Sequence, residues 1–389
     1  MKAIHFGAGN IGKGFIGNLL HKTSYHVCFV DVNQEVIQKI NDSQGYEIQL
    51  LDDDHTSEII TNVSALNSKT QENDVIQEIT RADLITTSVG ANNLHRIAPI
   101  LAKGLLVRIQ ENKRSINIMA NENAINATNI LKLEIDKHLT SEEIKQVAQF
   151  IGFPNTAIDR LALTDNNNSQ EKALVEPFYE WIINRSEMKN DGLQNIYGAT
   201  YVSELTPYLE RKLYTVNTGH ATAAYLGYLL GEKTVQSAIA LPFIEEHVRG
   251  ALKETGSYLI EKFGLHPEDH QAYIDKTIIR FKNKNVTDEV IRVARSPIRK
   301  IGFNERLVGP ARHLVEMGKE VEYLSIATAT AFLYNNSQDE ESVEIQNAIA
   351  TLGLEKSIQY YTNLEKSHEL ISKIKEKYTE LSNKFHICS

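Results

Sequence analysis

Short apolar runs alternate with amphipathic segments along the first half of the chain. Residues 2–6 (KAIHF) and 26–32 (HVCFVDV) are nearly continuous apolar runs, as expected of parallel strands that are buried on both faces. This alternation predicts an α/β fold with a parallel sheet that carries helices on both faces, a doubly wound sheet. Further apolar runs of strand length lie at 47–51, 58–66, 82–89 and 115–120.

The pattern changes in the second half of the chain. From Gln194 onward the apolar positions recur mainly at helical spacing, and residues 367–385 are typical of an amphipathic surface helix. The segment 335–342 (NNSQDEES) is a polar surface loop. We therefore expect two domains, with the sheet in residues 1–190 and a mostly α-helical domain in residues 191–389.

Composition and charge exclude several classes of protein. The 389 residues are enough for two hydrophobic cores, and 42% hydrophobic with 23% charged residues is ordinary for a soluble protein. The net charge of −9 argues against a nucleic-acid binder or an anionic-membrane binder, and no apolar stretch approaches the roughly 20 residues that cross a bilayer. Lys2–Phe6 leads directly into the first strand without a signal peptide, and the two cysteines are Cys28 and Cys388. We therefore expect a reducing, cytoplasmic setting.

A glycine-rich turn follows the first strand. Gly7 permits the tight turn, Gly9 lets backbone N–H groups approach a pyrophosphate, and Gly12 lets the following helix pack against the strand. The N-terminus of that helix directs its positive dipole end at the phosphates. We therefore expect a Rossmann-type dinucleotide site at this turn. The fingerprint G-x-G-x-x-G is matched by Gly7-Ala8-Gly9-Asn10-Ile11-Gly12.

Residues at the ends of two later strands extend this expectation. Asp31 lies at the end of the second predicted strand. A carboxylate there accepts hydrogen bonds from ribose hydroxyls and repels a 2′-phosphate, which favours NAD(H) over NADP(H) as the cofactor. Ser88 and Val89, which end the run 82–89, are expected beside the same cofactor because it binds at the carboxyl ends of the strands.

The same turn also has the beginning of a phosphate-binding P-loop, because Gly7 to Lys13 spells G-x-x-x-x-G-K. Gly14 stands where that motif needs the Ser or Thr that holds magnesium, so the P-loop interpretation fails. Lys13 then either lies near the pyrophosphate or is a solvated lysine in the first helical turn.

A second group of polar residues lies in the segment 210–230 (ERKLYTVNTGHATAAYLGYLL). At about 100° per residue, Lys212, Asn217 and His220 fall within an arc of roughly 140° on one helical face. Hydride transfer to or from an alcohol needs a group that takes the hydroxyl proton and donors that hold the alkoxide, and these side chains supply both. The alternative is structural, with His220 as a satisfied core residue and Lys212 as a solvated neighbour of Arg211.

No metal site is predicted. The thirteen histidines are scattered, and two cysteines cannot build a zinc centre of the alcohol-dehydrogenase type. His266 and His270 stand four residues apart, but they lie at a proline-initiated helix start that is rich in carboxylates. We interpret that start as a capped helix N-terminus.

Several segments together resemble the polyol-specific long-chain dehydrogenases, and the resemblance runs nearly from end to end. It implies an NAD-dependent, metal-independent enzyme in which the pattern Lys-x4-Asn-x2-His is the catalytic set. Lys212 is then the general acid/base, Asn217 and His220 position the substrate, and Asn123 helps to hold the reacting oxygen. The segments are KAIHFGAGNIGKGFIG, ANENAINAT, NTAIDRLAL, KLYTVNTGHATAAYLGYLLG and RVARSPIRKIGFNERLVGPA.

A third matching segment carries a substrate-binding candidate. The family signature Val-Asp-Arg here reads Ile158-Asp159-Arg160, which makes Asp159 that candidate. Two neighbouring positions depart from the family pattern. Asn121 replaces an expected cysteine and Leu163 replaces an expected Pro or Ser.

Within the family, the chain resembles the shorter branch that uses phosphorylated sugars, because no arm precedes the first strand. This branch implies reversible interconversion of fructose 6-phosphate and mannitol 1-phosphate. A phosphate needs a cationic clamp, for which arginine is well suited, and we favour Arg295 and Lys300. The cations of this region are Arg292, Arg295, Arg299, Lys300 and Arg306, some of which should pair with Glu289 or Glu305.

Two other functions stay open at this point. One is a dehydrogenase for an unphosphorylated polyol or a hexuronate, which would turn over its substrate without a phosphate. The other is a non-catalytic sensor that binds NADH through the first domain alone. A sensor would not need Lys212, Asn217 and His220 to be intact.

Overall fold

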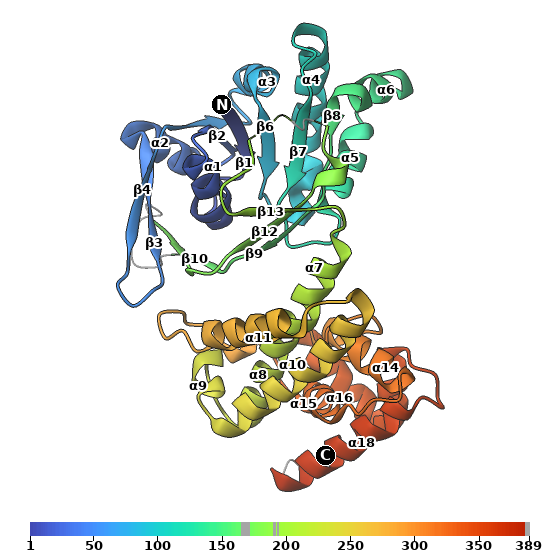
Figure 1. Ribbon diagram of the computed structural model, residues 1–389. Helices are drawn as coiled ribbons and strands as arrows, with labels where there is room; N and C mark the ends of the chain where they lie inside the picture. Colours follow the sequence, from blue (N-terminus) through green and yellow to red (C-terminus); the bar gives the residue numbers. More distant parts are fainter. Residues whose placement is uncertain (165–171, 190–191, 193, 386–389) are drawn as a thin grey trace. The chain divides into compact units, whose positions relative to one another are not determined.

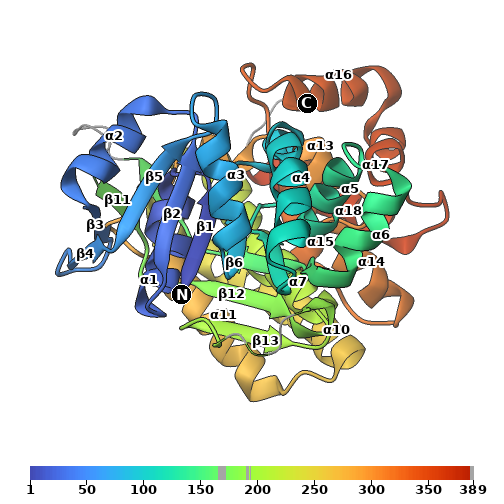
Figure 2. The same ribbon diagram turned by 90° about the horizontal axis from the view of Figure 1, so that it is seen from above.

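A computed structural model describes residues 1–164, 172–189, 192 and 194–385 (Figures 1 and 2). It forms two compact units, Met1–Tyr208 and Leu209–Ser389. The sequence pattern places the division near residue 190, but β13 (Ala199–Val202) pairs with β12 (Glu180–Asn184) and so keeps the chain in the first unit for longer. No described helix has the length and apolar character needed to cross a membrane.

Six strands form the main sheet of the first unit, and every pairing between them is parallel. Their order, β5-β2-β1-β6-β7-β8, is the 3-2-1-4-5-6 arrangement of the dinucleotide-binding fold. The predicted doubly wound sheet is therefore confirmed. The strands are β1 (Lys2–Phe6), β2 (His26–Asp31), β5 (Val63–Asn67), β6 (Leu84–Thr87), β7 (Ile116–Ala120) and β8 (Ile151–Gly152).

Alternate residues of the central strands enter two cores, one on each face of this sheet. Ala3 and Val27 belong to one core, whereas Ile4 and Cys28 belong to the other. The first core is covered by η1 (Gly12–Gly17), α1 (Asn18–Lys22) and α2 (Gln34–Ser43). The second is covered by α3 (Glu72–Arg81), α4 (Leu94–Glu111), α5 (Ala127–Asp136) and α6 (Ser141–Phe150), with α3 and α4 side by side in Figure 1.

Two smaller sheets complete the first unit. The predicted strand 58–66 is two strands, because Asn62 takes a left-handed conformation (φ 57°) between β4 (Ser57–Thr61) and β5. As a result β4 belongs to a small sheet and β5 to the main one. The small sheets are β10-β11-β3-β4 and β13-β12-β9, with β3 at Gly45–Leu50, β9 at Thr156–Asp159, β10 at Ala162–Thr164 and β11 at Lys172–Val175.

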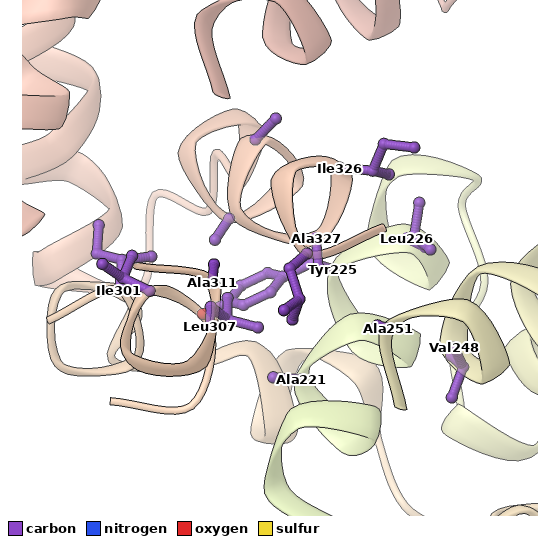
Figure 3. Close-up of a cluster of buried hydrophobic side chains, with 14 of the residues drawn as sticks. Ala221, Tyr225, Leu226, Val248, Ala251, Ile301, Leu307, Ala311, Ile326 and Ala327 are labelled. Atoms are coloured by element: carbon purple, nitrogen blue, oxygen red, sulfur yellow. The ribbon is translucent and has the colours of Figure 1, made fainter. Parts of the chain in front are cut away.

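The second unit is helical, as predicted. Its core draws on many helices, among them α8 (Thr218–Leu229), α10 (Pro242–Phe263), α15 (Glu322–Leu333) and α18 (Glu369–Lys384), and Figure 3 shows Tyr225 of α8 among Ala311, Leu307 and Ala327. The terminal helix predicted at 367–385 is α18. The helices are α7 (Thr206–Arg211, which begins in the first unit), η4 (Lys212–Asn217), α8 (Thr218–Leu229), α9 (Val235–Ile239), α10 (Pro242–Phe263), α11 (Pro267–Phe281), α12 (Val290–Ala294), α13 (Pro297–Lys300), α14 (Val308–Glu316), α15 (Glu322–Leu333), α16 (Glu340–Leu352), α17 (Leu354–Thr362) and α18 (Glu369–Lys384).

Candidate active site

The three fingerprint glycines occupy different environments. Gly7 has a positive φ of 105°, and a Cβ there would lie 2.6 Å from the carbonyl oxygen of Ser88. A Cβ on Gly12 would lie 2.0 Å from the carbonyl oxygen of Gly7. A Cβ on Gly9 would meet no atom within 4 Å. The fold therefore requires glycine at positions 7 and 12, whereas position 9 faces open space that a ligand can fill.

Hydrogen bonds bring the glycine turn, Asp31 and Ser88 together. The backbone N–H of Ala8 donates to Oδ2 of Asp31 (2.7 Å), and the N–H of Ser88 donates to the carbonyl of Phe6 (2.8 Å). The strand order reverses between β1 and β6, and ligands bind such sheets at the carboxyl ends of the strands at that point. The predicted cofactor residues of the turn, the acid and the β6 end therefore share one edge of the sheet.

Lys13 is buried. The residue is 5% exposed, so the interpretation as a solvated lysine is wrong. Burial, and next the charge of Lys39, lower the pKa of Lys13, while Asp31 acts in the opposite direction. The helix begins at Asn10 and Ile11 and runs into the π-turn η1, a helix form that often occurs at functional sites.

Glu122 clamps the loop after β6, a role that sequence reasoning missed. Its Oε1 accepts hydrogen bonds from the Thr87 hydroxyl (2.8 Å) and the Val89 N–H (2.9 Å), and its Oε2 accepts one from the Gly90 N–H (2.7 Å). The side chain is 7% exposed. The signal in the sequence is one acid between two asparagines, Asn121 and Asn123, directly after a buried strand.

Asn121 and Asn123 differ in environment. Asn121 is 1% exposed and its Oδ1 accepts a hydrogen bond from the hydroxyl of Thr156 (3.0 Å). It thus joins the end of β7 to β9. Asn123 is exposed in the turn that leads to α5.

Asp159 lies at the end of β9 with 9% exposure, and its neighbour Arg160 holds the glycine-turn helix. The Arg160 guanidinium donates to the carbonyls of Gly14 (2.9 Å) and Glu176 (3.0 Å) and lies over the ring of Tyr179. Burial lowers the pKa of Arg160 to about 10. Arg160 is therefore a structural link from β9 to η1, and it places the adjoining Asp159.

The Lys–Asn–His segment is helical but is not a regular α-helix. Lys212 begins the π-turn η4 and Asn217 ends it. Hydrogen bonds from residue i to i+5 put more residues into each turn than the 3.6 of an α-helix. Lys212 and Asn217 therefore lie closer in angle than the roughly 140° arc that α-helical geometry predicts.

Burial marks the outward face of this segment. From Tyr214 to Gly227, Asn217 and His220 are partly exposed and every other residue is buried. Lys212 is partly exposed as well. The three predicted residues thus share the solvent-facing side of an otherwise buried helical run.

His220 has a carboxylate partner that sequence reasoning missed. Its Nε2 lies 2.6 Å from Oδ2 of Asp288, which is 3% exposed, and its ring stacks on Phe281 at a centroid distance of 5.1 Å. The imidazole is 27% exposed. The core-residue alternative therefore does not describe His220.

The segment that carries the predicted phosphate-binding cations, residues 292–306, packs against α8. The Tyr225 hydroxyl donates to the carbonyl of Ala294 (3.0 Å), and the Thr218 hydroxyl donates to the carbonyl of Arg306 (2.7 Å). Lys300, which lies between Ala294 and Arg306 in the sequence, is 4% exposed, and its ammonium donates to the carbonyl of Arg295. Burial, and then the charges of Arg306 and Arg299, lower the pKa of Lys300 to about 7.

The arginines of the cluster differ in surroundings. Arg306 pairs with Glu305, as expected, whereas Arg292 pairs with Asp288 and not with Glu289. Arg295 is exposed. Arg292 and Arg295 line a hollow of about 420 Å³ that also contains the carboxylates Glu289, Asp339, Glu340 and Glu341. Lys300 is thus the most deeply buried cation of the predicted phosphate clamp.

Within the described residues, no three side chains of His, Cys, Asp or Glu gather as metal ligands would. His270 is 4% exposed, and burial lowers its pKa to about 4. His266 is exposed at the start of α11.

Comparison with known families identifies both units. The mannitol dehydrogenase Rossmann domain matches residues 1–196, and the mannitol dehydrogenase C-terminal domain matches residues 204–382. The chain belongs to the mannitol dehydrogenase family. Among relatives in this family, a protein of Geobacillus stearothermophilus named mannitol-1-phosphate 5-dehydrogenase is 42% identical over 98% of this chain and 100% of its own length. A Bacillus subtilis protein of the same name is 45% identical over 95% of this chain and 97% of its own.

Two solved dehydrogenase structures share the fold. A D-sorbitol dehydrogenase in substrate-free form matches with a TM-score of 0.85 at 16% identity, over 98% of this chain and 93% of that one. The mannitol 2-dehydrogenase of Pseudomonas fluorescens, solved with NAD and D-mannitol, matches with a TM-score of 0.74 at 15% identity, over 99% and 92% of the two chains.

Proposed function

We propose that this protein interconverts fructose 6-phosphate and mannitol 1-phosphate by hydride transfer with NAD(H). The observation that carries the proposal is the 42% and 45% identity, over nearly the full length, to relatives named mannitol-1-phosphate 5-dehydrogenase. The cysteine content, two in 389 residues, favours a reducing cytoplasm as the place of the reaction.

The described residues fit an NAD cofactor. Open space at Gly9, the helix start behind it and the Asp31 carboxylate at the end of β2 suit a pyrophosphate and an unphosphorylated ribose. Ala8, Asn10, Ile11, Ser88 and Val89 would supply further contacts to it. When bound, the dinucleotide accepts or supplies the hydride.

The protein's own groups then handle the proton and hold the substrate. In the oxidation, Lys212 takes the proton of the substrate hydroxyl while the hydride leaves the carbon that bears this hydroxyl. In the reduction, Lys212 returns a proton to that oxygen. Asn217 and Asn123 donate hydrogen bonds to the reacting oxygen. Asn217 is partly exposed at the end of η4, and Asn123 is exposed after β7.

Recognition of the rest of the substrate falls to other residues. Asp159 accepts hydrogen bonds from sugar hydroxyls, and Lys300 with Arg295 binds the phosphate. Lys300 supports this assignment best, because an anion would stabilise a buried ammonium that is otherwise disfavoured.

The proposal is tested by NADH oxidation with three substrates: fructose 6-phosphate, fructose and a keto-hexuronate. We expect turnover of fructose 6-phosphate and little of the other two, because only the first carries the phosphate. Equal rates with fructose would reject the phosphate assignment, and turnover of the hexuronate alone would favour the alternative reductase. NADH binding with no turnover of any substrate would favour the sensor.

The acid/base role of Lys212 is tested separately. Lys212→Ala should lower kcat by roughly 100-fold or more, as expected for loss of a general acid/base, while NADH affinity is retained. Lys253→Ala, on the surface of α10, is the control. Full activity of the Lys212 variant would remove the lysine from the mechanism.

A further inference from the structure

Asp288 is a buried acid that contacts His220 in the second unit. It lies in the segment between α11 and α12, far in sequence from His220, and it is 3% exposed. Its backbone is fixed on both sides, because the N–H of Val235 donates to its carbonyl (2.8 Å) and its own N–H donates to Oε1 of Gln236 (3.2 Å). The carboxylate is therefore held in place by α9 and does not depend on His220 for its position.

Both oxygens of this carboxylate are engaged. Oδ2 lies 2.6 Å from Nε2 of His220, and Oδ1 accepts a hydrogen bond from Nε of Arg292 (2.9 Å). Burial opposes the charge, but the hydrogen bond from His220 and the neighbouring Arg292 guanidinium outweigh it and lower the pKa of Asp288. An ionised carboxylate can only accept hydrogen bonds, so the proton of this contact belongs to Nε2 of His220.

The ring of His220 is also held from the side. It stacks on Phe281 with an interplanar angle of 16°, and a Cβ on the adjacent Gly219 would lie 3.0 Å from the same phenyl ring. Nδ1 has no hydrogen-bonding partner among the residues that the structure describes. The imidazole is thus fixed at one nitrogen and one face. His220 is partly exposed, as is Asn217 on the same helical run.

We infer that Asp288 is a positioning residue that fixes the tautomer of His220, so that Nδ1 of His220 receives a hydrogen bond from a substrate hydroxyl. This inference rests on the function proposed above and deepens it. A neutral imidazole with its proton on Nε2 is an acceptor at Nδ1. It suits the hydroxyl next to the reacting carbon and not a carbonyl oxygen, so the reacting oxygen is left to Lys212, Asn217 and Asn123.

The first test is a mutant cycle. Asp288→Asn can place its amide N–H against Nε2 and so favour the opposite tautomer, in which Nδ1 carries the proton. We expect kcat/KM for fructose 6-phosphate to fall roughly 10- to 100-fold, by analogy with other partners that orient a functional histidine. In a His220→Ala background the same substitution should cost less than about twofold, because Asp288 then has no ring to orient.

The control is a second aspartate that pairs with an arginine. Asp275 on α11 pairs with Arg249 at 2.7 Å and does not contact His220, so Asp275→Asn should leave kcat/KM unchanged. If Asp288→Asn lowered kcat/KM equally with and without His220, its effect would be structural and the inference would be rejected.

The second test does not depend on turnover. With ¹⁵N-labelled histidine in the full chain and a His220→Gln variant to assign its signals, the ring nitrogen shifts report which nitrogen carries the proton. We expect the proton of neutral His220 on Nε2 in the wild type and on Nδ1 in Asp288→Asn. A wild-type ring protonated on Nδ1 would overturn the inference even if fructose 6-phosphate is a substrate. The Nε2 form in a protein that does not turn over this sugar would reject the proposed function and keep the positioning role.

Discussion

Gly7, Gly9 and Gly12 have different reasons to be glycine. Gly7 needs its positive φ, and Gly12 lies too close to the carbonyl of Gly7 for any Cβ. Gly9 has neither restriction, so the reason for its lack of a side chain lies in what binds there. This difference separates folding from cofactor binding within one turn.

Substitution of Gly9 should therefore affect NADH binding, whereas substitution of Gly12 should affect stability. Gly9→Ala should leave the Tm unchanged and weaken NADH binding about tenfold or more, which corresponds to ~1.4 kcal/mol. Gly12→Ala should lower the free energy of unfolding by about 1–3 kcal/mol, as overpacked positions do. Thermal unfolding and a fluorescence titration with NADH measure the two effects. A Gly9→Ala protein with lost stability and intact NADH affinity would contradict this assignment.

Lys300 gives a second prediction at this scale. A lysine is charged below its pKa, so with a pKa of about 7 the free Lys300 loses its charge as the pH rises through neutrality. The KM for fructose 6-phosphate should therefore rise between pH 7 and 9, and Lys300→Met should raise it about tenfold at pH 7 and remove that rise, with the KM for NADH unchanged. Lys319→Met, a surface lysine paired with Glu261, is the control. A Lys300→Met enzyme with an ordinary KM would exclude Lys300 from the phosphate site.

Spacing along the chain identifies residues that share a helix but not their tertiary partners. Lys212, Asn217 and His220 could be grouped by periodicity because one helical run carries them. Asp288 could not, because only the packing of α9, α11 and α12 against α8 brings it to His220. The role of Glu122 was missed for the same reason, since its partners lie at the end of β6 and in the loop that follows it.

At the scale of elements, the predictions succeed where burial is continuous. The runs 2–6 and 115–120 match β1 and β7 within one residue, because strands covered on both faces are apolar throughout. The short strands from β9 to β13 were not predicted, since β10 has only three residues and β11 pairs with the distant strand β3. The π-turn η4 was read as regular α-helix, because one extra residue in a turn hardly changes apolar spacing.

Contacts between helices yield a prediction about pH. Glu254 on α10 accepts hydrogen bonds from the N–H groups of Tyr323 and Leu324 at the start of α15 (2.9 and 2.8 Å), and burial raises its pKa to about 7. Between pH 4.5 and 7 the folded state holds a proton that the unfolded state releases. The free energy of unfolding should therefore fall as the pH rises through this window, by at most roughly 3 kcal/mol from this group.

Glu254→Gln should flatten that decline, because an amide does not titrate. Urea unfolding at pH 5 and pH 8 measures the change in the free energy of unfolding for the wild type and the variant. Glu261→Gln on the same helix is the control, since its side chain is 54% exposed and it faces Lys319. An unchanged pH dependence in the Glu254 variant would assign the decline to other groups.

At the scale of the whole molecule, each unit has the means to fold alone. The first unit has a core on each face of its main sheet, and the second has one helical core of its own. The length of 389 residues already indicated more than one core, but the exact division depends on β13, whose pairing with β12 is not visible in local sequence. The candidate cofactor residues belong to the first unit and the Lys–Asn–His set to the second.

This distribution predicts that NADH binding and catalysis can be separated by dividing the chain between Leu205 and Thr206, ahead of α7. The fragment 1–205 keeps all the strands of the three sheets, so it should fold and bind NADH, with saturation at 100 times Kd stabilising it by about 2.7 kcal/mol. It should not oxidise NADH with fructose 6-phosphate, because Lys212 and His220 are absent. The fragment 206–389 should fold without binding NADH. Calorimetry of both fragments with and without NADH measures this stabilisation. A fragment 1–205 that folds but gains no stability from NADH would mean that residues of the second unit are needed to hold the cofactor.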